Sequence, residues 1–363
     1  MEKQDSLINY IIANKSKIVK NYFYYKNVKI NLGIKLKNNE EKALIFLSLD
    51  SPLHFSNFFK VSRDKLLELI NAPEYSSYTI PKKKGGKRSI ESPSEELKLI
   101  QNTINYHLQH YYLNLRPTNI HGFIIKNPET KSSYNIIENA RLHIKSKYVL
   151  TIDLQNFFSS ITGKRVYSLF SSGLFDFSDE SAKALTFLCT YKGILPTGSP
   201  ASPVLSNFIC LELDRSLLSF CIEKNIIYSR YADDLSFSSN SLFTEELLNG
   251  LKSIIVKHHF KINEKKVRLK STNRRQIVTG LVVNEKVNIN RKILKLVRAI
   301  LNDCKKNGIE NACANHYKLK EKPSLQVITK FQNKLRGHIN FIKQVRGEDF
   351  LYQRLKNELD SHF

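Results

Sequence analysis

Two adjacent aspartates, Asp233 and Asp234, restrict the fold of this chain more than any other feature. They lie within SRYADDLSFSS (229–239), where aromatic and β-prone residues flank them and no helical period is present. Neighbouring side chains on a strand point to opposite faces, so the pair fits best in a tight turn between two strands. Like charges side by side destabilise each other unless cations neutralise them. Taken alone, the segment is also compatible with an ordinary acidic turn.

A second acidic position gives the pair a chemical role. Asp153 lies in the short apolar run KYVLTIDL (147–154), which predicts a buried strand, and two aromatic residues follow it. A carboxylate at the end of a buried strand is typical of a site at that edge of a sheet. If Asp153 and Asp233 meet on neighbouring strands, they can hold two Mg²⁺ ions about 3.5–4 Å apart, as phosphoryl transfer requires.

The net charge of +24 over 363 residues indicates a polyanionic partner, because such an excess otherwise opposes compactness. A basic protein at a membrane surface is the alternative. No run of 18 apolar residues is present, and the N-terminal sequence lacks the apolar core of a signal peptide. We therefore expect a cytoplasmic nucleic-acid-binding protein with no membrane partner. The five cysteines form no CxxC pair, which predicts reduced, mostly buried thiols.

Hydrophobic periodicity predicts both helices and strands. Helical spacing is present at 61–70, which Ser62 can cap, at 96–113 and at 243–260. Segment 78–92 predicts two short strands around a basic, glycine-containing turn. Segment 277–290 predicts a hairpin that turns at residues 284–286. Residues 291–363 are expected to form helices with one apolar and one basic side.

Three segments together resemble the sequence boxes of reverse transcriptases, in the order and spacing of that family. YADD (231–234) looks like the catalytic box, and LTIDLQNFF (150–158) looks like the strand with the first metal ligand. GILPTGSPASPVLSN (193–207) is similar to the stretch beneath the incoming nucleotide and template. The resemblance covers residues 75 to 345 approximately and implies an α+β right-hand polymerase with an antiparallel palm sheet and a helical thumb. The implied division is an N-terminal helical extension at 1–75, the first part of the fingers at 76–146, the palm with fingers elements at 147–290 and a basic helical thumb at 291–363.

The resemblance also assigns the residues of a polymerase site. Asp153 and Asp233 match the main metal ligands and Asp234 completes the site, so two Mg²⁺ ions and deoxynucleoside triphosphates are implied. Four further residues are implied to contact the nucleotide: Arg88, Phe158, Gly198 and Lys266.

These nucleotide contacts have plain structural alternatives. Phe158 matches the aromatic residue that excludes a ribose 2′-hydroxyl, and the alternative is a core aromatic residue. Arg88 matches a fingers residue that holds the triphosphate, while its lysine neighbours can form a solvated basic turn. Lys266 lies in KINEKK (261–266), which resembles the loop whose lysine approaches the leaving pyrophosphate, and the alternative is a surface lysine.

Two short elements are similar to those of retron reverse transcriptases. NARLH (139–143) matches an Asn-Ala-x-x-His element, and IVTGL (277–281) contains Val-Thr-Gly. The resemblance implies that these elements bind RNA through Asn139, His143, Val278, Thr279 and Gly280. Taken separately, His143 fits a helix surface and the Thr-Gly pair fits a strand with a bulge.

The retron branch implies a specific partner and product. The implied template is a cognate structured non-coding RNA, copied from the 2′-hydroxyl of an internal guanosine into branched multicopy single-stranded DNA. The implied role is antiphage defence with a separate effector protein, and a host ribonuclease H is expected to remove the template. The alternatives are a group II intron-like or abortive-infection reverse transcriptase and, in another class, a catalytically idle RNA-binding protein.

Overall fold

The computed structural model describes residues 38–82 and 85–361. The N-terminal extension predicted at 1–75 is helical where it is described, and its residues 1–37 lie outside the described part. Three helices form it: α2 (Asn38–Leu47), α3 (Pro52–Phe59) and α4 (Arg63–Asn71). Ser62 caps α4 as predicted, because its side chain accepts a hydrogen bond from the backbone N–H of Lys65.

The chain divides into two compact units. The first unit contains the described residues up to Tyr134 together with Ile152–Leu235 and Phe243–Val267. The second unit contains Asn135–Thr151, Ser236–Leu242 and the chain from Arg268 onward. Each unit therefore combines segments that are distant in sequence.

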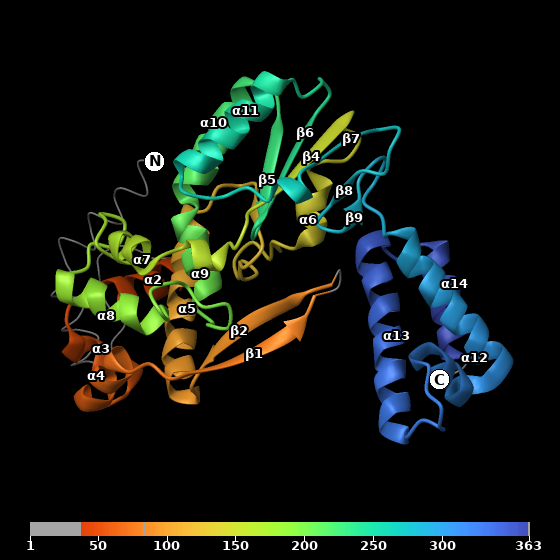
Figure 1. Ribbon diagram of the computed structural model, residues 1–363, viewed down its shortest axis with the longest axis horizontal. Helices are drawn as coiled ribbons and strands as arrows, with labels where there is room; N and C mark the ends of the chain where they lie inside the picture. Colours follow the sequence, from red (N-terminus) through yellow and green to blue (C-terminus); the bar gives the residue numbers. More distant parts are fainter. Residues whose placement is uncertain (1–37, 83–84, 362–363) are drawn as a thin grey trace. The chain divides into compact units, whose positions relative to one another are not determined.

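A long two-stranded ribbon follows the first helices in the first unit (Figure 1). β1 (Tyr75–Pro81) pairs antiparallel with β2 (Lys87–Pro93), as the sequence predicted for 78–92. Gly85 and Gly86 have φ of 88° and 84° in the connecting turn, a backbone conformation that residues with a Cβ rarely adopt. The long helix α5 (Glu95–Leu115) comes directly after β2 and confirms the helix predicted at 96–113.

The main sheet has five strands in the order β3-β5-β6-β4-β7. These strands are β3 (Ile120–His121), β4 (Tyr148–Asp153), β5 (Ile227–Tyr231), β6 (Asp234–Ser239) and β7 (Arg268–Ser271). β4 pairs antiparallel with β7, and a tight turn joins β5 to β6. The short strand β3 is the exception to the expected antiparallel pattern, because it runs parallel to β5.

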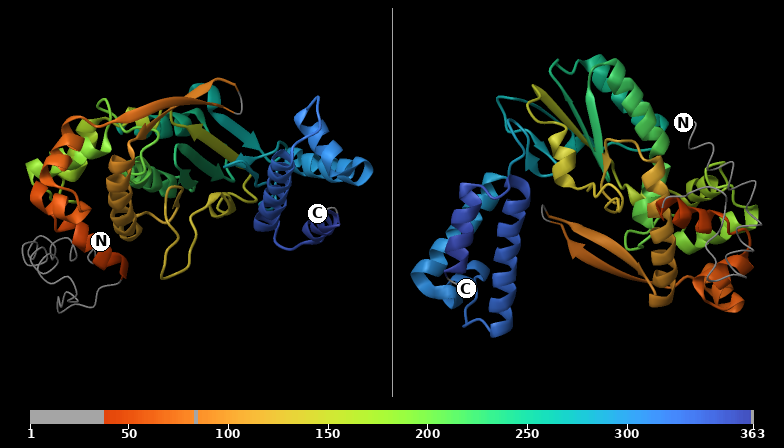
Figure 2. Two further views of the ribbon diagram at one scale, coloured as in Figure 1. Left: turned by 90° about the horizontal axis from the view of Figure 1, so that it is seen from below. Right: turned by 180° about the vertical axis from the view of Figure 1, so that it is seen from behind.

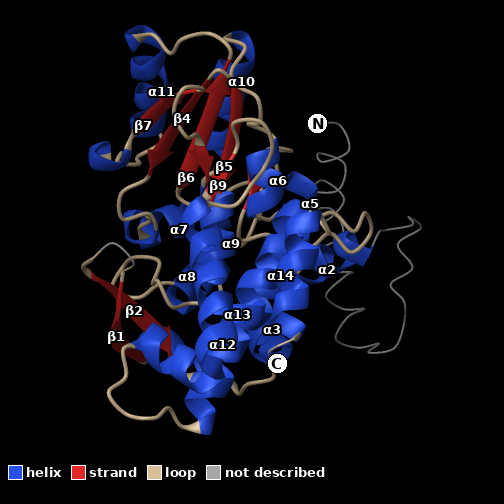
Figure 3. Cartoon of the chain, turned by 90° about the vertical axis from the view of Figure 1, so that its right-hand side faces the viewer, coloured by secondary structure: helices blue, strands red, loops and turns tan. Residues whose placement is uncertain are grey.

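Helices cover the strands and fill the remainder of the first unit. They are α7 (Gly163–Phe170), α8 (Asp179–Cys189), α9 (Ser202–Ile209), α10 (Leu211–Glu223) and α11 (Glu245–Lys257). α10 packs against both α11 and β5 (Figure 3). The helix predicted at 243–260 is confirmed as α11, whose cap is the side chain of Thr244.

The hairpin predicted at 277–290 turns earlier than expected. β8 (Ile277–Val278) pairs antiparallel with β9 (Leu281–Val282), which leaves Thr279 and Gly280 as a two-residue turn. Their φ values of 47° and 86° are both positive, as the twist of a type I′ hairpin requires. The predicted return around residues 284–286 is a second, wider one, closed by a bridge between Val282 and Asn288.

Three helices end the chain, as predicted for 291–363 (Figure 2). They are α12 (Arg291–Tyr317), α13 (Leu325–Arg346) and α14 (Phe350–Asp360), and α12 contains a break at Gly308. The predicted apolar face of α13 is buried at every position: Ile328, Phe331, Leu335, Ile339 and Ile342. These helices share one hydrophobic core with the hairpin and with α6 (Ile136–Arg141), so the second unit has a core of its own.

Two general expectations can be compared with the structure. All five cysteines are free and buried, as predicted. Among the helices of the described residues, none combines the length and the apolarity that crossing a bilayer requires.

Candidate active site

The paired aspartates lie at the turn between β5 and β6, as predicted. Ala232 takes a left-handed conformation with φ of 57°, and Asp234 begins β6. The backbone N–H of Leu154 donates to the carbonyl oxygen of Asp233 at 3.0 Å, so the end of β4 lies directly beside this turn. Asp153 and Asp233 are therefore neighbours in space, whereas Asp234 is the exposed member of the pair.

The charges of nearby side chains influence the pKa of Asp233. Burial raises the pKa of Asp233, and the neighbouring Asp153 carboxylate raises it further. The positive charges of Lys266 and Arg88 act in the opposite direction. Four ionisable side chains from separate segments thus lie within electrostatic reach of one point, and sequence analysis had predicted all four as site residues.

Asp153 is held in place by a short helical turn, Glu264–Lys266. The Nζ of Lys266 donates to both carboxylate oxygens of Asp153, at 2.8 and 3.0 Å. The side-chain amide of Asn263 donates to Oδ2 at 3.3 Å, and its backbone N–H donates to the Asp153 carbonyl at 2.9 Å. Sequence analysis missed Asn263, although it lies within KINEKK, because an amide there carries no distinctive signal.

The donor chemistry of this site fits a hard divalent cation. Asp153 and Asp233 supply carboxylate oxygens, which Mg²⁺ prefers. Within 38–82 and 85–361, no three His, Cys, Asp or Glu side chains form a ready-made metal cage. Magnesium sites of phosphoryl-transfer enzymes commonly use one or two carboxylates and complete the shell with water and substrate phosphates. The partly buried carboxylates of Asp153 and Asp233, which are neighbours in space, are sufficient for that kind of site.

Gly198, the second glycine of the GILPTGSP stretch, packs against the strand β2, which carries Arg88. A Cβ on Gly198 would lie 2.3 Å from the carbonyl oxygen of Glu91, so only glycine allows this approach. Thr197 fixes the same contact, because its hydroxyl donates to the Ser89 carbonyl at 2.9 Å and to Glu91 Oε2 at 2.8 Å. The loop and strand β2 are thereby joined next to Arg88.

Phe158 is half-buried and lies between other rings. Its ring centroid is 5.7 Å from that of Phe123 and 5.4 Å from that of Phe157. It begins the short 3-10 turn Phe158–Ser160, which follows β4 after four residues. The Phe158 ring is therefore held by contacts with two other aromatic rings, while part of it remains accessible to solvent.

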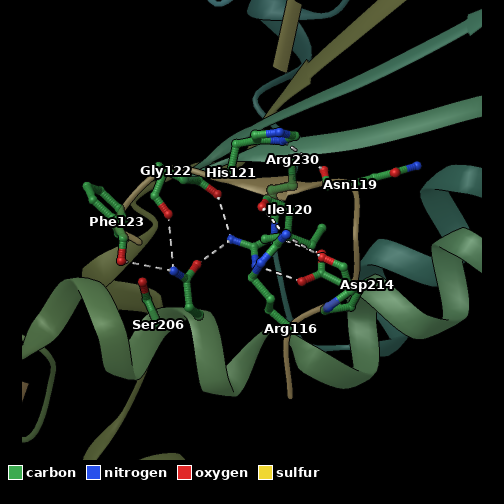
Figure 4. Close-up of polar contacts among 12 residues, drawn as sticks. Arg116, Asn119, Ile120, His121, Gly122, Phe123, Ser206, Asp214 and Arg230 are labelled. Carbon is green, nitrogen blue, oxygen red and sulfur yellow. Dashed lines mark hydrogen bonds and ion pairs between the residues drawn. The ribbon is translucent and has the colours of Figure 1, made fainter. Parts of the chain in front are cut away.

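A buried ion pair between Arg230 and Asp214 lies next to the aspartate turn (Figure 4). Arg230 and Asp214 both have side chains with 0% exposure. The guanidinium donates to the two Asp214 oxygens at 2.8 and 2.6 Å, to Asn207 Oδ1 at 3.0 Å and to the Ala232 carbonyl at 3.1 Å. The hydroxyl of Tyr228 donates to Asp214 as well, at 2.8 Å. Arg230 thus holds the backbone of the turn directly.

The hydrogen-bond network of Arg230 extends to Phe123, whose ring contacts Phe158. Asn207 donates to the carbonyl oxygens of Gly122 and Phe123, at 3.2 and 3.4 Å. A Cβ on Gly122 would lie 3.0 Å from the backbone nitrogen of Ala232, so this segment touches the turn closely. Sequence analysis missed Arg230, Asn207 and Asp214, because no local pattern indicates that side chains from three separate segments meet in one buried network.

The two short elements predicted to bind RNA come together in the second unit. The Thr279 hydroxyl donates to the carbonyl of Ile136 at 3.0 Å, which joins the β8–β9 turn to α6. His143 Nδ1 lies 2.8 Å from Ser238 Oγ, and both His143 and Asn139 have 0% exposure. The Asn139 amide has no hydrogen-bond partner within the described residues.

The five predicted RNA contacts differ in accessibility. Asn139, His143 and Val278 are buried, Thr279 is half-buried and Gly280 is exposed. The first three side chains therefore pack inside the second unit in this structure, and only the turn itself reaches solvent.

Comparison with known proteins identifies a family. Residues 80–282 match the family described as reverse transcriptase (RNA-dependent DNA polymerase). The chain is 34% identical to the retron Ec86 reverse transcriptase of Escherichia coli, over 74% of this chain and 79% of that protein. It is 31% identical to the retron Ec83 reverse transcriptase of Escherichia coli, over 70% and 83%. A solved structure of telomerase from Candida albicans with a fragment of telomeric RNA aligns over 81% of this chain and 64% of its own, with a TM-score of 0.45 and 11% identity.

Proposed function

Because the chain belongs to the retron reverse transcriptases, which are RNA-directed DNA polymerases, we propose that it copies a cognate structured RNA into branched single-stranded DNA. An RNA template is a partner of any such enzyme, and the relatives favour the retron branch over the intron-like and abortive-infection alternatives. The observation that carries the catalytic part is the placement of Asp233 beside the end of the strand that bears Asp153, with Lys266 bonded to the Asp153 carboxylate.

The parts of a right-hand polymerase are assigned along the chain within this proposal. Residues 76–146 form the first part of the fingers, 147–290 the palm with fingers elements, and 291–363 the thumb. Residues 1–75 precede them as an extension. The aspartate turn and the sheet strands β4, β5, β6 and β7 fall in the proposed palm, whereas the short strand β3 falls in the range of the proposed fingers. Helices α12 to α14 fall in the proposed thumb.

Asp153 and Asp233 would hold two divalent metal ions, and Asp234 would complete the site. When bound, such ions would lower the pKa of the primer hydroxyl and neutralise charge on the leaving pyrophosphate. The chain itself positions the carboxylates: Asn263 and Lys266 orient Asp153, and the left-handed turn before Asp233 presents the second carboxylate beside it.

The nucleotide is held and selected by residues around these carboxylates. Arg88 and Lys266 bring positive charge to the triphosphate, and the second also attracts the leaving pyrophosphate. Gly198 lets its loop lie flat against β2, next to Arg88. Phe158, supported by Phe123 and Phe157, leaves no room beneath the sugar for a 2′-hydroxyl, which favours deoxynucleotides.

RNA recognition is assigned to the second unit. The NARLH element and the Val-Thr-Gly turn lie against each other through Thr279 and the Ile136 carbonyl. Asn139, His143 and Val278 act from inside by fixing this arrangement, and Gly280 lies at its exposed edge. The product is retained with the protein as an RNA–DNA hybrid, a host ribonuclease H trims the template, and a separate effector completes an antiphage system.

The test combines purification with primer extension. Nucleic acid that co-purifies with the protein is sequenced with and without ribonuclease treatment, and the protein is assayed with Mg²⁺ on an RNA template. We expect a short DNA joined at its 5′ end to a guanosine 2′-oxygen of the RNA, and extension that needs the divalent metal. A DNA with a free 5′ end, or one primed from an ordinary 3′-hydroxyl, would contradict the retron proposal while leaving the polymerase intact.

A further inference from the structure

A small cavity of about 320 Å³ lies in the second unit, beside the elements that carry both retron motifs. Its lining residues come from the end of α6 and the residues after it, the return that follows β9, and the last turn of α13 (Figure 1). They are Arg141, Ile144, Lys286, Val287, Val345 and Arg346. Three are cationic and three are aliphatic, so one small space offers charge and apolar surface together.

The walls of this cavity are fixed by hydrogen bonds. The backbone N–H of Lys145 donates to the carbonyl oxygen of Asn284 at 3.1 Å, which joins the α6 side to the return after β9. Arg346 donates to Asn288 Oδ1 at 2.8 Å, which joins α13 to the same return. The contact between Thr279 and α6 completes the frame. A preorganised cavity costs less ordering entropy when a ligand binds.

Two of the three cations can be offered to a ligand. Lys286 is exposed and makes no hydrogen bond or ion pair within the part of the chain that the structure describes, although with Arg346 it lowers the pKa of the Asp349 carboxyl. Arg141 is exposed and pairs with Glu138 at 3.0 Å, an interaction of a kind that is worth only about 0.2–1 kcal/mol. Arg346 is committed to Asp349 and Asn288, so it serves as part of the wall.

We propose that this cavity binds one nucleotide of the cognate RNA, with a phosphate on Arg141 and Lys286 and the base or sugar against Ile144 and Val287. The proposal rests on the proposed retron function and names the surface through which the RNA is recognised. Structured RNA is read mainly at loops and bulges whose nucleotides are splayed out, and such a nucleotide presents both an anion and an apolar face. The volume lies at the lower end of small-ligand pockets, about 300–1,000 Å³. With a chain of net charge +24, RNA is favoured over an acidic peptide.

The site also accounts for the burial of the motif residues. Asn139 and His143 have no exposed surface, yet Arg141 of the same NARLH element lines the cavity. The buried members then set the position of α6, and an exposed neighbour makes the contact. We therefore expect substitutions of exposed residues that line the cavity to change RNA selection without changing the fold.

A matched pair of double variants tests the proposal in the full-length protein. Arg141→Ala with Lys286→Ala removes the two available cations. Arg215→Ala with Lys257→Ala removes two exposed cations from α10 and α11, and Arg215 has the same i,i+3 glutamate pairing as Arg141. The probe is the RNA recovered from the wild-type protein and resynthesised by transcription, with a generic primer–template duplex as comparison.

We expect the cavity variant to lose tenfold or more in affinity for the recovered RNA, with a log–log salt slope lower by about 0.7–0.9 for each lost phosphate contact. Extension of the generic primer and binding by the control variant should not change. Ile144→Asn should lower the affinity for the recovered RNA without altering the salt slope, because Ile144 makes an apolar contact. Equal losses in both double variants, or no loss in the cavity variant, would overturn the proposal.

Failure of the retron function gives a different result. A wild-type protein that binds the recovered RNA no better than a scrambled RNA of equal length would contradict the retron proposal and the cavity proposal together. A selective wild type with an equally selective cavity variant contradicts the cavity alone. If the cavity variant keeps RNA selectivity but loses a co-purifying acidic protein, the cavity is a protein-docking site and the nucleotide proposal is wrong.

Discussion

Replacing Arg230 should separate the stability of the first unit from its catalytic geometry. The guanidinium is fully buried and makes its two shortest bonds to Asp214, at 2.6 and 2.8 Å. Its other two bonds reach the Ala232 carbonyl in the aspartate turn and the Asn207 side chain. Arg230→Met leaves the Asp214 carboxylate buried with the Tyr228 hydroxyl as its remaining side-chain donor in the network. Removing one partner of a buried pair costs about 3–5 kcal/mol, and we expect that loss in the free energy of unfolding.

A double variant distinguishes the positioning of the aspartate turn from the stability of the fold. Arg230→Met with Asp214→Leu removes both charges, and apolar replacement of a whole buried pair is often neutral or stabilising by about 1–4 kcal/mol. The Tyr228 hydroxyl then loses its acceptor, which costs about 1–3 kcal/mol, so stability should return close to the wild-type value. The bond to the Ala232 carbonyl is not restored. A misplacement near 1 Å costs about 100-fold in rate, so kcat should remain about 100-fold low.

The assay pairs denaturation with steady-state kinetics. The chain has no tryptophan, so urea unfolding is followed by far-ultraviolet circular dichroism, and kcat and KM for a deoxynucleotide are measured on an RNA template. Gln101→Leu is the control, because Gln101 is fully buried and bonds Tyr75 and Leu188 away from the turn. It should lower stability and leave kcat unchanged at a permissive temperature. A double variant that regains both stability and kcat would refute the positioning role.

Three further outcomes are expected. Asp233→Asn should abolish polymerisation and leave RNA binding intact, and more than about one-thousandth of the wild-type activity would contradict the metal site, since losing a metal ligand there should cost several kcal/mol. Phe158→Ala should admit ribonucleotides, measured as the ratio of deoxynucleotide to ribonucleotide efficiency, and an unchanged ratio in an active variant would exclude the steric role. Neutralising several lysines and arginines within 291–346 should reduce the slope of log duplex affinity against log salt concentration by about 0.7–0.9 for each lost phosphate contact. An unaltered slope would mean that the basic side of the C-terminal helices does not contact the duplex.

The position of the aspartates was predictable because strands and turns leave strong local signals. Asp153 ends an apolar strand, and the Asp-Asp pair interrupts β-prone sequence, so each position follows from residues next to it in the chain. The meeting of the two segments depends on strand order, which the three-box resemblance supplied. The turn of the β8–β9 hairpin was placed too late, because Thr279 is β-branched, whereas turn positions with positive φ are usually occupied by glycine, asparagine or aspartate.

Residue type alone does not reveal which polar side chains are buried. Arg230 received no role from the sequence, although it has no exposed surface and bonds the backbone of the aspartate turn. Burial matters for NARLH as well, because the structure places His143, a predicted RNA-binding residue, beside Ser238 with no exposed surface. A substitution of His143 that abolished branched synthesis would therefore report on the position of α6 as much as on RNA contact. Comparison with Arg141, which is exposed on the same element, separates these causes, because its loss can weaken RNA binding while the core contacts of α6 remain.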